Sequence, residues 1–416
     1  MRTVICGFST AIICSKFSRY LSHSRILAIM NPNSDVPLAT VLNELRTVAD
    51  QTFEQARPIP AATNHSRAFH EHERKTVFMQ EWVCLGREDE ISAHGNYLTD
   101  EIAGVPVFVV RQKDGAIAAF VNACAHRFAC LLPSAQGSAK RFTCRYHAWT
   151  YNCEGDLVAA PHMEMKPGFS RSEHKLRPLQ VALWQGFIYV TLTEKPRTIL
   201  RQVLKPLADN VVGRYHMAGY KTVLRETMTW NANWKNLIEN FTESYHVPVA
   251  HRKTFAKHEK PLDQYICGED SDYYSYHRAP QKAETGLGAA HANNTRLQGE
   301  WRRMMVDFCI FPCHLVTLMP DYLWWIAVQP HGVDQFNATW GVAFPPEILE
   351  DVADNDFDQW LKEFKNYMDV ANDEDKELVE ALHKGSRSPV LPQGAYHPIE
   401  RNLWQFNRYL ARLCGA

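Results

Sequence analysis

Two short loops rich in metal-ligating side chains constrain this chain more than any other feature. One loop is Cys124-x-His126 and the other is Cys144-x-x-His147. The apolar runs 107–110 and 117–121 flank Lys113-Asp114-Gly115, a pattern that predicts a β-hairpin leading into the first loop. A metal centre held by both loops would join them at the end of this hairpin.

The composition of the two loops indicates which metal centre they hold. Two thiolates on one iron and two imidazoles on the other form the ligand set of a Rieske two-iron, two-sulfur cluster. Structural zinc is the alternative, but zinc sites usually pair like ligands, as C-x-x-C with H-x3–5-H. Because each half here mixes Cys with His, we predict a Rieske cluster bound by Cys124, His126, Cys144 and His147.

A second group of ligand residues, Glu243-x-x-His246 followed by His251, lies in a separate part of the chain. The segment before His246 carries apolar residues at helical spacing, and Asn240, Glu243 and His246 step by three, so they project near one another. Pro248 ends or kinks this helix, which lets His251 return to the same point. Two histidines and a carboxylate with open positions form a non-haem iron site. Two histidines without a metal are the alternative.

The carboxylate of that site is predicted to come from further along the chain. The candidate is Asp375, in the acidic stretch 372–378. Residues 378–382 begin an apolar stripe, so Asp375 is expected in the first turn of a helix. Acidic residues favour that position through capping and the helix dipole alone. The residues by themselves therefore leave a purely structural role open.

The motifs resemble those of the catalytic α subunit of Rieske non-haem iron oxygenases, the aromatic-ring-hydroxylating dioxygenase family and its monooxygenase relatives. The resemblance covers residues 60 to 416 and includes Asn233-Trp234-Lys235 and Glu239-Asn240-x-x-Glu243-x-Tyr245-His246. It implies His246 and His251 as iron ligands and Asp375 as the third, with Asp373 and Glu374 as the next candidates. It also implies that Glu243 bridges the two metal centres across a subunit boundary. Asn240 joins Glu243 as a candidate catalytic residue.

The resemblance implies an α+β fold with three parts. Residues 1–60 form an N-terminal extension and helix, 61–193 an all-β Rieske [2Fe-2S] domain, and 194–416 a helix-grip catalytic domain. The implied cofactors are one cluster and one mononuclear Fe(II) per subunit. The implied partners are dioxygen, a small-molecule substrate and a ferredoxin or flavin reductase that draws electrons from NAD(P)H. A homotrimer is expected.

The resemblance leaves the substrate open. The main expectation is hydroxylation of an aromatic ring or aromatic acid, and the alternative is a monooxygenase or N-demethylase acting on a quaternary ammonium compound. Glu243 stands where many dioxygenases have Asp, and one residue fewer separates Asn240 from His246 than in naphthalene-type enzymes. Both departures resemble the homotrimeric branch, which includes phthalate, carnitine and glycine-betaine oxygenases. A Rieske electron carrier and a zinc hydrolase are remote alternatives.

Composition restricts the setting. The net charge is −1, so neither nucleic acid nor an anionic membrane is an expected partner. Eleven Cys in 416 residues do not form a disulfide framework, and with an iron–sulfur cluster they favour a reducing, cytoplasmic location. No apolar run is long enough to predict a membrane span. Residues 1–29 are basic and free of acids, which is typical of a transit peptide or of a start codon placed upstream of Met30.

Periodicity predicts the remaining elements in outline. Helices are expected at 41–54, 68–82, 355–370 and 375–383, and strands at 221–229, 305–310, 315–319, 322–329 and 338–344, with a loop region at 255–300. Phe311, Tyr322, Trp324 and Trp325 are candidates for a pocket wall that suits a planar ring or, through cation–π attraction, a quaternary ammonium group. Sheet core is the alternative for each. Alternation places Trp324 and Trp325 on opposite faces.

Overall fold

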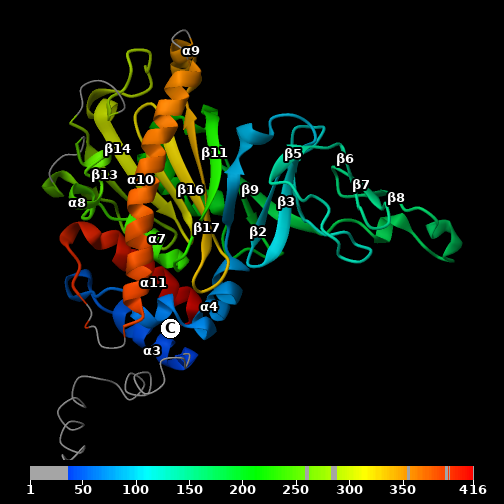
Figure 1. The fold of residues 1–416 in the computed structure, drawn as a ribbon, viewed down its shortest axis with the longest axis horizontal. Coiled ribbons are helices and arrows are strands. Elements are labelled where there is room, and N and C mark those ends of the chain that lie inside the picture. The colour runs from blue at the N-terminus through cyan, green and yellow to red at the C-terminus, as the bar shows by residue number, and fades with distance from the viewer. Residues whose placement is uncertain are drawn as a thin grey trace, which may run out of the picture.

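The computed structural model describes residues 36–257, 262–282, 288–353, 357–388, 392 and 394–415. The stretch 1–29, expected to be a transit peptide or to precede the true start, lies outside them. The chain forms two lobes, one all-β and one with a sheet and helices, so the α+β expectation is confirmed (Figure 1). Within the described part of the chain, no helix is both long enough and apolar enough to cross a bilayer.

The N-terminal lobe consists of antiparallel strands. One sheet has the order β1-β10-β9-β4-β3-β2-β5 and a smaller one the order β6-β7-β8. The predicted hairpin is confirmed, because β3 pairs with β4 from Val107↔Val121 to Arg111↔Ile117. The strands are β1 Val83–Arg87, β2 Asn96–Ile102, β3 Val105–Arg111, β4 Ile117–Val121, β5 Gln136–Ser138, β6 Arg141–Thr143, β7 Thr150–Asn152, β8 Leu157–Ala159, β9 Pro178–Trp184 and β10 Phe187–Thr191.

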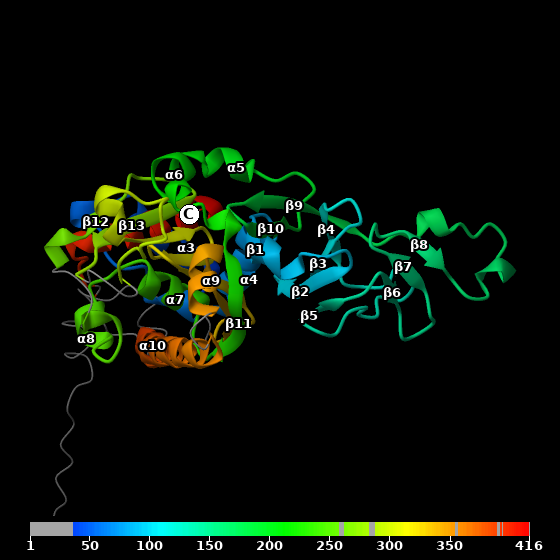
Figure 2. The same ribbon diagram turned by 90° about the horizontal axis from the view of Figure 1, so that it is seen from above.

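The C-terminal lobe is built on one antiparallel sheet of order β11-β17-β16-β15-β14-β13-β12. Its strands are β11 Lys221–Trp230, β12 Ile266–Cys267, β13 Tyr274–Pro280, β14 Met304–Ile310, β15 His314–Leu318, β16 Leu323–Pro330 and β17 Phe336–Phe344. The α-helices of the described residues are α3 Leu38–Ala49, α4 Arg67–Glu73, α5 Leu200–Val203, α6 Lys205–Asn210, α7 Trp234–Phe241, α8 Val247–Ala250, α9 Pro346–Ala353, α10 Phe357–Ser386 and α11 Arg401–Cys414. Figure 2 shows α10 and the α5–α6 pair on opposite sides of this sheet.

The two faces of the C-terminal sheet pack against different layers. Trp324 belongs to the apolar core that includes α7, α10 and α11, whereas Trp325 belongs to the core that the N-terminal lobe shares. The predicted alternation of these two residues is therefore confirmed. In the shared core the Phe187 ring lies 4.4 Å from the His314 ring, and the hydroxyl of Tyr189 lies 2.6 Å from His314 Nδ1. The two lobes are thus joined through a common buried layer.

The prediction of two separate helices at 355–370 and 375–383 is wrong, because α10 runs without a break through both. Its buried positions continue at steps of three and four across the acidic stretch, at Phe364, Met368, Ala371, Asn372, Asp375, Val379 and His383. No Gly or Pro interrupts residues 357–384 to stop the helix. Asp375 consequently lies in the middle of a long helix and not in a first turn.

Three other element predictions need correction. The region 255–300 is not only loop, since β12 and β13 extend the sheet there. The helix expected at 41–54 is α3, which follows Pro37 and ends at Ala49. The helix expected at 68–82 starts after the cap Ser66 and continues as a π-turn to Phe78.

Candidate metal centres

The two Cys/His loops have matching backbone geometry. The N–H of Cys124 donates to the Ala129 carbonyl at 2.9 Å, and the N–H of Cys144 donates to the Trp149 carbonyl at 2.8 Å. Four residues after each cysteine the backbone adopts a left-handed conformation, at Phe128 (φ 62°) and Ala148 (φ 58°). Each turn closes with a hydrogen bond back to the cysteine carbonyl. The loops therefore present their cysteines and histidines in equivalent ways.

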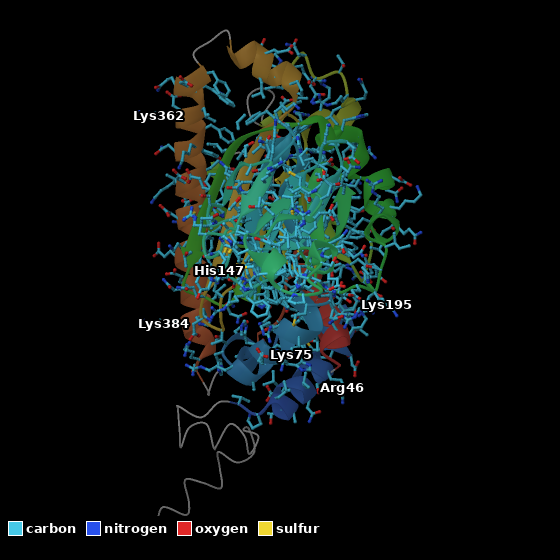
Figure 3. All side chains as sticks on the ribbon, turned by 90° about the vertical axis from the view of Figure 1, so that its right-hand side faces the viewer. Arg46, Lys75, His147, Lys195, Lys362 and Lys384 are labelled. Carbon is cyan, nitrogen blue, oxygen red and sulfur yellow. The ribbon has the colours of Figure 1, made fainter. Side chains whose placement is uncertain are left out.

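The four predicted cluster residues lie together at the far end of the N-terminal lobe. Cys124 and Cys144 are 1% and 3% exposed, whereas His147 is exposed. The His126 and His147 rings are 4.7 Å apart, and Trp149 stacks on His126 with ring centres 4.8 Å apart. Figure 3 views the molecule from this end, with His147 on the side facing the reader. The thiols are thus inside and one imidazole reaches the surface.

The chemistry of this donor set fits a Rieske cluster. Burial and the neighbouring His147 lower the pKa of His126, which favours the neutral imidazole that binds metals. Burial raises the pKa of the Cys124 thiol, so a thiolate there needs compensating metal charge. The Nδ1 atom of His126 is buried and has no hydrogen-bond partner among the described residues. An iron at that atom would satisfy it.

Tyr151 was not singled out from the sequence, yet it contacts the cluster loop. Its hydroxyl lies 3.3 Å from Cys124 Sγ and accepts a hydrogen bond from the Ala125 N–H at 3.1 Å. Tyr151 itself is fully buried. Hydrogen bonds to the sulfurs are one of the features that set the potential of such clusters. Tyr151 is therefore placed to influence the cluster that Cys124 holds.

The helix before the second ligand group is shorter than predicted. Helix α7 starts after Asn233, whose side chain accepts the Lys235 N–H, and ends at Phe241. The Thr242 hydroxyl donates to the Ile238 carbonyl, and Asn402 of α11 donates to the Thr242 carbonyl at 3.0 Å. These bonds replace the next helical turn. Glu243 and His246 are thus outside the helix, contrary to the prediction.

Pro248 also has a different role from the one expected. It lies in the first turn of the short helix α8 and does not end the preceding helix. Proline suits this position because the first N–H groups of a helix have no intrahelical partner. The loop 242–246 together with α8 carries the chain from His246 to His251.

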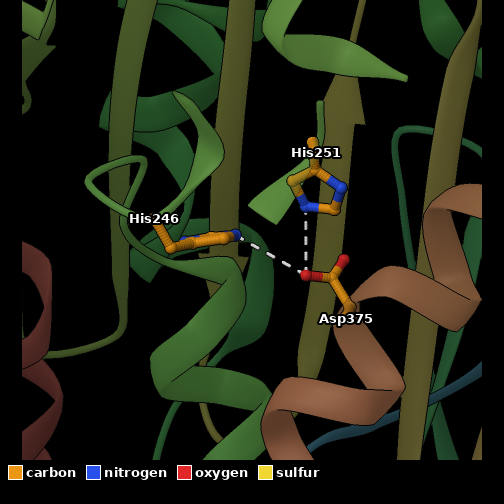
Figure 4. Close-up of side chains that lie close together, drawn as sticks. All are labelled: His246, His251 and Asp375. Atoms are coloured by element: carbon orange, nitrogen blue, oxygen red, sulfur yellow. Dashed lines mark ion pairs between the residues drawn. The ribbon is translucent and has the colours of Figure 1, made fainter. Parts of the chain in front are cut away.

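His246, His251 and Asp375 come together as the sequence analysis expected. The Nε2 atom of His251 lies 3.1 Å from Asp375 Oδ1, and the Nε2 atom of His246 lies 3.5 Å from the same oxygen (Figure 4). All three ligand atoms lie within 4.8 Å of one another. Asp375 Oδ1 is buried and, apart from these two ring nitrogens, has no hydrogen-bond partner among the described residues. A metal ion coordinated by the three side chains would satisfy it.

The electrostatics of the triad favour a bound cation. Burial acts to lower the pKa of His246, but the carboxylates of Asp375 and Glu243 outweigh it and raise the pKa to about 10. Burial acts to raise the pKa of Asp375, yet the two imidazoles lower it to about 2. The pocket therefore keeps an ionised carboxylate and attracts positive charge. A metal ion binding there would displace the imidazole protons.

The second ring nitrogen of each histidine has a carboxylate partner. Glu243 Oε1 lies 2.6 Å from His246 Nδ1, which confirms the predicted contact, although a turn and not a helix brings it about. Glu374 Oε2 lies 3.1 Å from His251 Nδ1 and accepts the Thr254 hydroxyl. Such partners fix the orientation of metal-binding histidines. The sequence analysis had Glu374 only as a substitute for Asp375, and Asp373 is exposed, away from the site.

Asn240 lies beside the triad, with its amide nitrogen 3.5 Å from His246 Nε2. It is 6% exposed and comes from the last turn of α7. Asn240, Glu243 and His246 also border a cavity of about 750 Å³ between α7 and α10. The opposite wall includes Leu378, Leu382 and Tyr396.

Aromatic side chains surround the other side of the triad. Phe255 lies 5.0 Å from the His251 ring and 6.2 Å from Trp324, and Trp324 lies 6.0 Å from Phe241. Tyr367 of α10 packs 5.7 Å from Phe255. Of the four residues predicted as candidates for a pocket wall, Trp324 lies next to Phe255 within the apolar core. The other three belong to core: Phe311 packs on Phe406 and Tyr409, Tyr322 on Phe344 and Phe364, and Trp325 lies on the opposite face of the sheet.

Comparison with known proteins agrees with this pair of centres. Residues 81–175 match the family model of the Rieske [2Fe-2S] domain, and residues 212–416 match that of the ring hydroxylating alpha subunit (catalytic domain). These two matches define an iron-dependent oxygenase. The chain belongs to the Rieske non-haem iron oxygenases, as their catalytic subunit. Its cofactors are a Rieske [2Fe-2S] cluster and a mononuclear iron.

Sequence relatives match this chain over most of its length or over a part of it. The carnitine monooxygenase oxygenase subunit of Escherichia coli (strain K12) is 27% identical over 338 residues, which are 80% of this chain and 86% of the relative. The chloroplastic choline monooxygenase of Arabidopsis thaliana is 27% identical over 94% of this chain and 90% of its own length. The glycine betaine monooxygenase oxygenase subunit of Chromohalobacter salexigens is 38% identical over 43% of this chain and 40% of the relative.

Solved structures share the fold. A quaternary ammonium Rieske monooxygenase superposes with a TM-score of 0.76 at 22% identity, covering 91% of this chain and 99% of the other. Naphthalene 1,2-dioxygenase from Rhodococcus sp. superposes with a TM-score of 0.74 at 21% identity, covering 90% and 97%. Both likenesses establish the architecture only, because enzymes with different substrates share it.

Proposed function

We propose that this chain is the oxygenase component of a monooxygenase that acts on a small quaternary ammonium compound. The observation that carries the proposal is the common chemistry in the names of its sequence relatives, since carnitine, glycine betaine and choline all contain a trimethylammonium group. The main expectation from the sequence, an aromatic substrate, receives less support from these relatives. Aromatic faces beside the triad suit a quaternary ammonium group through cation–π attraction.

In this proposal each side chain has a definite task. Cys124, His126, Cys144 and His147 hold the cluster, and His246, His251 and Asp375 hold the mononuclear iron. When bound, the cluster supplies single electrons and the mononuclear iron supplies the activation of dioxygen. Glu243 and Glu374 keep the two iron-binding imidazoles oriented through their second nitrogens. Phe255 and Trp324 position the substrate and exclude water.

We also propose that the chain works as a ring-shaped oligomer, most simply a homotrimer. In both ribbon views β6 and β7, which flank the second cluster loop, lie on the opposite side of the molecule from α8 and α10, which carry or adjoin the triad (Figures 1 and 2). The end that bears His147 also exposes Phe128 and Tyr146, 82% and 54% exposed, which is a costly arrangement for an uncovered surface. A ring would bring His147 of one copy to the cavity beside Glu243 of the next. Glu243 would then connect the two centres.

The remaining parts of the proposal concern domains and partners. We place the Rieske domain at 61–193 and the catalytic domain at 194–416, with 1–60 as an N-terminal extension. Electrons are proposed to come from NAD(P)H through a separate reductase or ferredoxin, as is typical of the family. None of the nine cysteines in the described part of the chain forms a disulfide, in keeping with the proposed reducing, cytoplasmic setting.

A substrate panel tests the function. Purified holoenzyme, supplied with a reductase and NADH, is offered choline, glycine betaine, carnitine, benzoate and phthalate while oxygen uptake is recorded. We expect uptake above the substrate-free rate with at least one of the quaternary amines and none with the aromatic acids. Asp375→Ala is the matched control and should abolish the increment. Uptake with benzoate or phthalate alone would overturn the proposal in favour of an aromatic substrate.

A further inference from the structure

One buried acidic side chain of the catalytic sheet has no part in the site described above. Asp307 lies on β14, on the sheet face that α7, α10 and α11 cover. Every other residue of β14 is buried, and on β15 the only residue that is not fully buried is Thr317, the cross-strand neighbour of Asp307. The Asp307 side chain is 12% exposed. Asp307 and Thr317 thus keep some accessible surface at a point where the residues around them on both strands are buried.

Asp307 belongs to a row of residues that runs across four strands. His277 of β13 pairs with Asp307, Asp307 with Thr317, and Thr317 with Trp324 of β16. Directly opposite residues on neighbouring antiparallel strands have side chains in contact distance on one face. The carboxylate of Asp307 is thus two strands away from the indole of Trp324. Trp324 in turn contacts Phe255, which packs on the iron-binding His251.

The carboxylate of Asp307 is held in place by two contacts. The Thr317 hydroxyl donates to Oδ1 at 2.6 Å, and His277 Nε2 lies 3.1 Å from Oδ2. His277 is fixed by Ser244, whose hydroxyl lies 2.8 Å from the same Nε2, and by Asn402 at 3.3 Å from Nδ1. Ser244 precedes His246 by two residues, so the network reaches the triad loop. The orientation of Asp307 is therefore set before any ligand arrives.

From this arrangement we infer that Asp307 supplies the negative charge that selects a cationic substrate, with Trp324 and Phe255 as the aromatic walls. The inference rests on the proposed function and identifies the residue that carries its specificity. A quaternary ammonium group has no N–H to donate, so it is recognised by charge and by aromatic faces, not by a directed hydrogen bond. A carboxylate in a site with little water attracts a cation far more strongly than one at the surface.

Trp324 adds a second polar group to the same place. Its indole N–H is buried and meets no acceptor among the described residues. Buried donors without a partner are rare in proteins, and a ligand oxygen is one way to satisfy them. A small substrate that carries both an ammonium group and a hydroxyl or carboxylate oxygen would match Asp307 and Trp324 together. This combination distinguishes the pocket from one built for an unsubstituted aromatic ring.

The test compares a cation with its uncharged isostere. Choline and 3,3-dimethylbutan-1-ol have the same shape and differ in the charge on the central atom. Their binding to the anaerobic holoenzyme is measured by titration calorimetry for the wild type, Asp307→Asn and Asp114→Asn. Asp114 lies on the exposed turn between β3 and β4, so its variant makes the same change of charge far from the pocket. Iron content and the visible spectrum show that each variant keeps both metal centres.

We expect the wild type to bind choline more tightly than the alcohol. Asp307→Asn should weaken choline binding on the order of tenfold or more and leave the alcohol unchanged, Asp114→Asn should change neither, and Asp307→Glu should keep the preference. If the wild type prefers choline and Asp307→Asn keeps that preference, the role of Asp307 is refuted but the proposed function is not. A wild type without any preference for the cation would instead overturn the proposed function.

A structure of the wild type with choline gives a second measurement that does not depend on a variant. The inference expects the ammonium group between the Asp307 carboxylate and the aromatic faces of Trp324 and Phe255. A choline nitrogen bound elsewhere in the catalytic lobe would refute it even if Asp307→Asn failed to fold.

Discussion

The ion pair between Glu73 and Lys235 offers the sharpest test of the energetics of this fold. Lys235 belongs to α7, which leads to the iron-binding loop, and Glu73 ends α4. Lys235 Nζ lies 2.8 Å from one Glu73 oxygen and 3.1 Å from the other, and both side chains are fully buried. Burial raises the pKa of Glu73, while the ammonium group of Lys235 opposes that shift. Removing Lys235 therefore leaves a carboxylate without its counter-charge.

The loss of folding free energy in Lys235→Met can be calculated from the protonation of Glu73. The least costly response of a lone buried Glu73 is to take up a proton. Relative to its ordinary pKa of 4.5, protonation costs about 1.4 kcal/mol for each pH unit, hence about 3.4 kcal/mol at pH 7 and about 1.4 kcal/mol at pH 5.5. The first value agrees with the range of about 3–5 kcal/mol seen when one partner of a buried pair is removed.

The sign of the pH dependence follows from the direction of the shift. In Lys235→Met the folded-state pKa of Glu73 lies above the unfolded value. The contribution of Glu73 to the free energy of unfolding is therefore fully present below the unfolded pKa and is lost as the pH rises through the folded pKa. The variant should therefore recover part of its stability on acidification. For a domain of this size we expect a melting temperature on the order of 10 °C below wild type at pH 7, and about 4 °C below it at pH 5.5.

Scanning calorimetry at the two pH values measures this difference. The double variant Glu73→Gln with Lys235→Met is the matched control, because it lacks the titrating carboxyl and its deficit should stay constant with pH. A deficit for Lys235→Met that is equal at both pH values would refute the assignment of the cost to Glu73. So would a deficit too small to distinguish from the wild type at pH 7.

Four further predictions concern the metal centres. Asp375→Ala should reduce the iron content from about three to about two atoms per chain while the cluster's visible spectrum persists; full iron retention would remove Asp375 from the ligand set. Glu374→Ala should weaken mononuclear iron binding by roughly 10–100-fold, because His251 loses the partner of its second nitrogen; titration of the iron-depleted protein measures this. Tyr151→Phe should lower the cluster potential on the order of 50 mV in a redox titration, because a hydrogen bond that stabilises the reduced form is lost; an unchanged potential would mean that the hydroxyl is not a donor to Cys124. Glu243→Gln should retain both metal centres but lose most reductant-dependent oxygen uptake, and normal uptake, or a fully active wild-type monomer, would contradict the proposed bridge.

The sequence was most informative where ligand residues are close together along the chain. Each loop around Cys124 and Cys144 has its two metal ligands within a few residues, so the ligand types and their spacing predict the cluster directly. The hairpin before the loops follows from the alternation of apolar residues. The acidic stretch of α10 predicts a helix start by its composition, whereas burial of Asn372 and Asp375 inside the lobe keeps the helix continuous. Tertiary packing overrides local propensity in this way throughout proteins.

The errors near the iron site have a similar origin. Helix α7 ends at Phe241 partly because Asn402, which is distant in the sequence but close in the fold, donates a hydrogen bond to the Thr242 carbonyl. The partnership of Glu374 with His251 likewise joins residues far apart in the chain. No periodicity within either segment encodes such contacts. The same limit explains why Phe255 was missed as a neighbour of the triad.

The buried layer between the two lobes has a mechanical consequence. Phe187, Tyr189 and Trp184 of the N-terminal lobe pack directly on His314, Phe308 and Trp325 of the catalytic sheet. Close-packed interiors resist deformation. The orientation of the N-terminal lobe relative to the catalytic lobe is therefore fixed by this layer. A change of volume at Phe187 would then be amplified into a displacement of His147 at the far tip. In the proposed ring, the distance between the cluster of one copy and the iron of the next would thus be controlled by residues that contact neither metal.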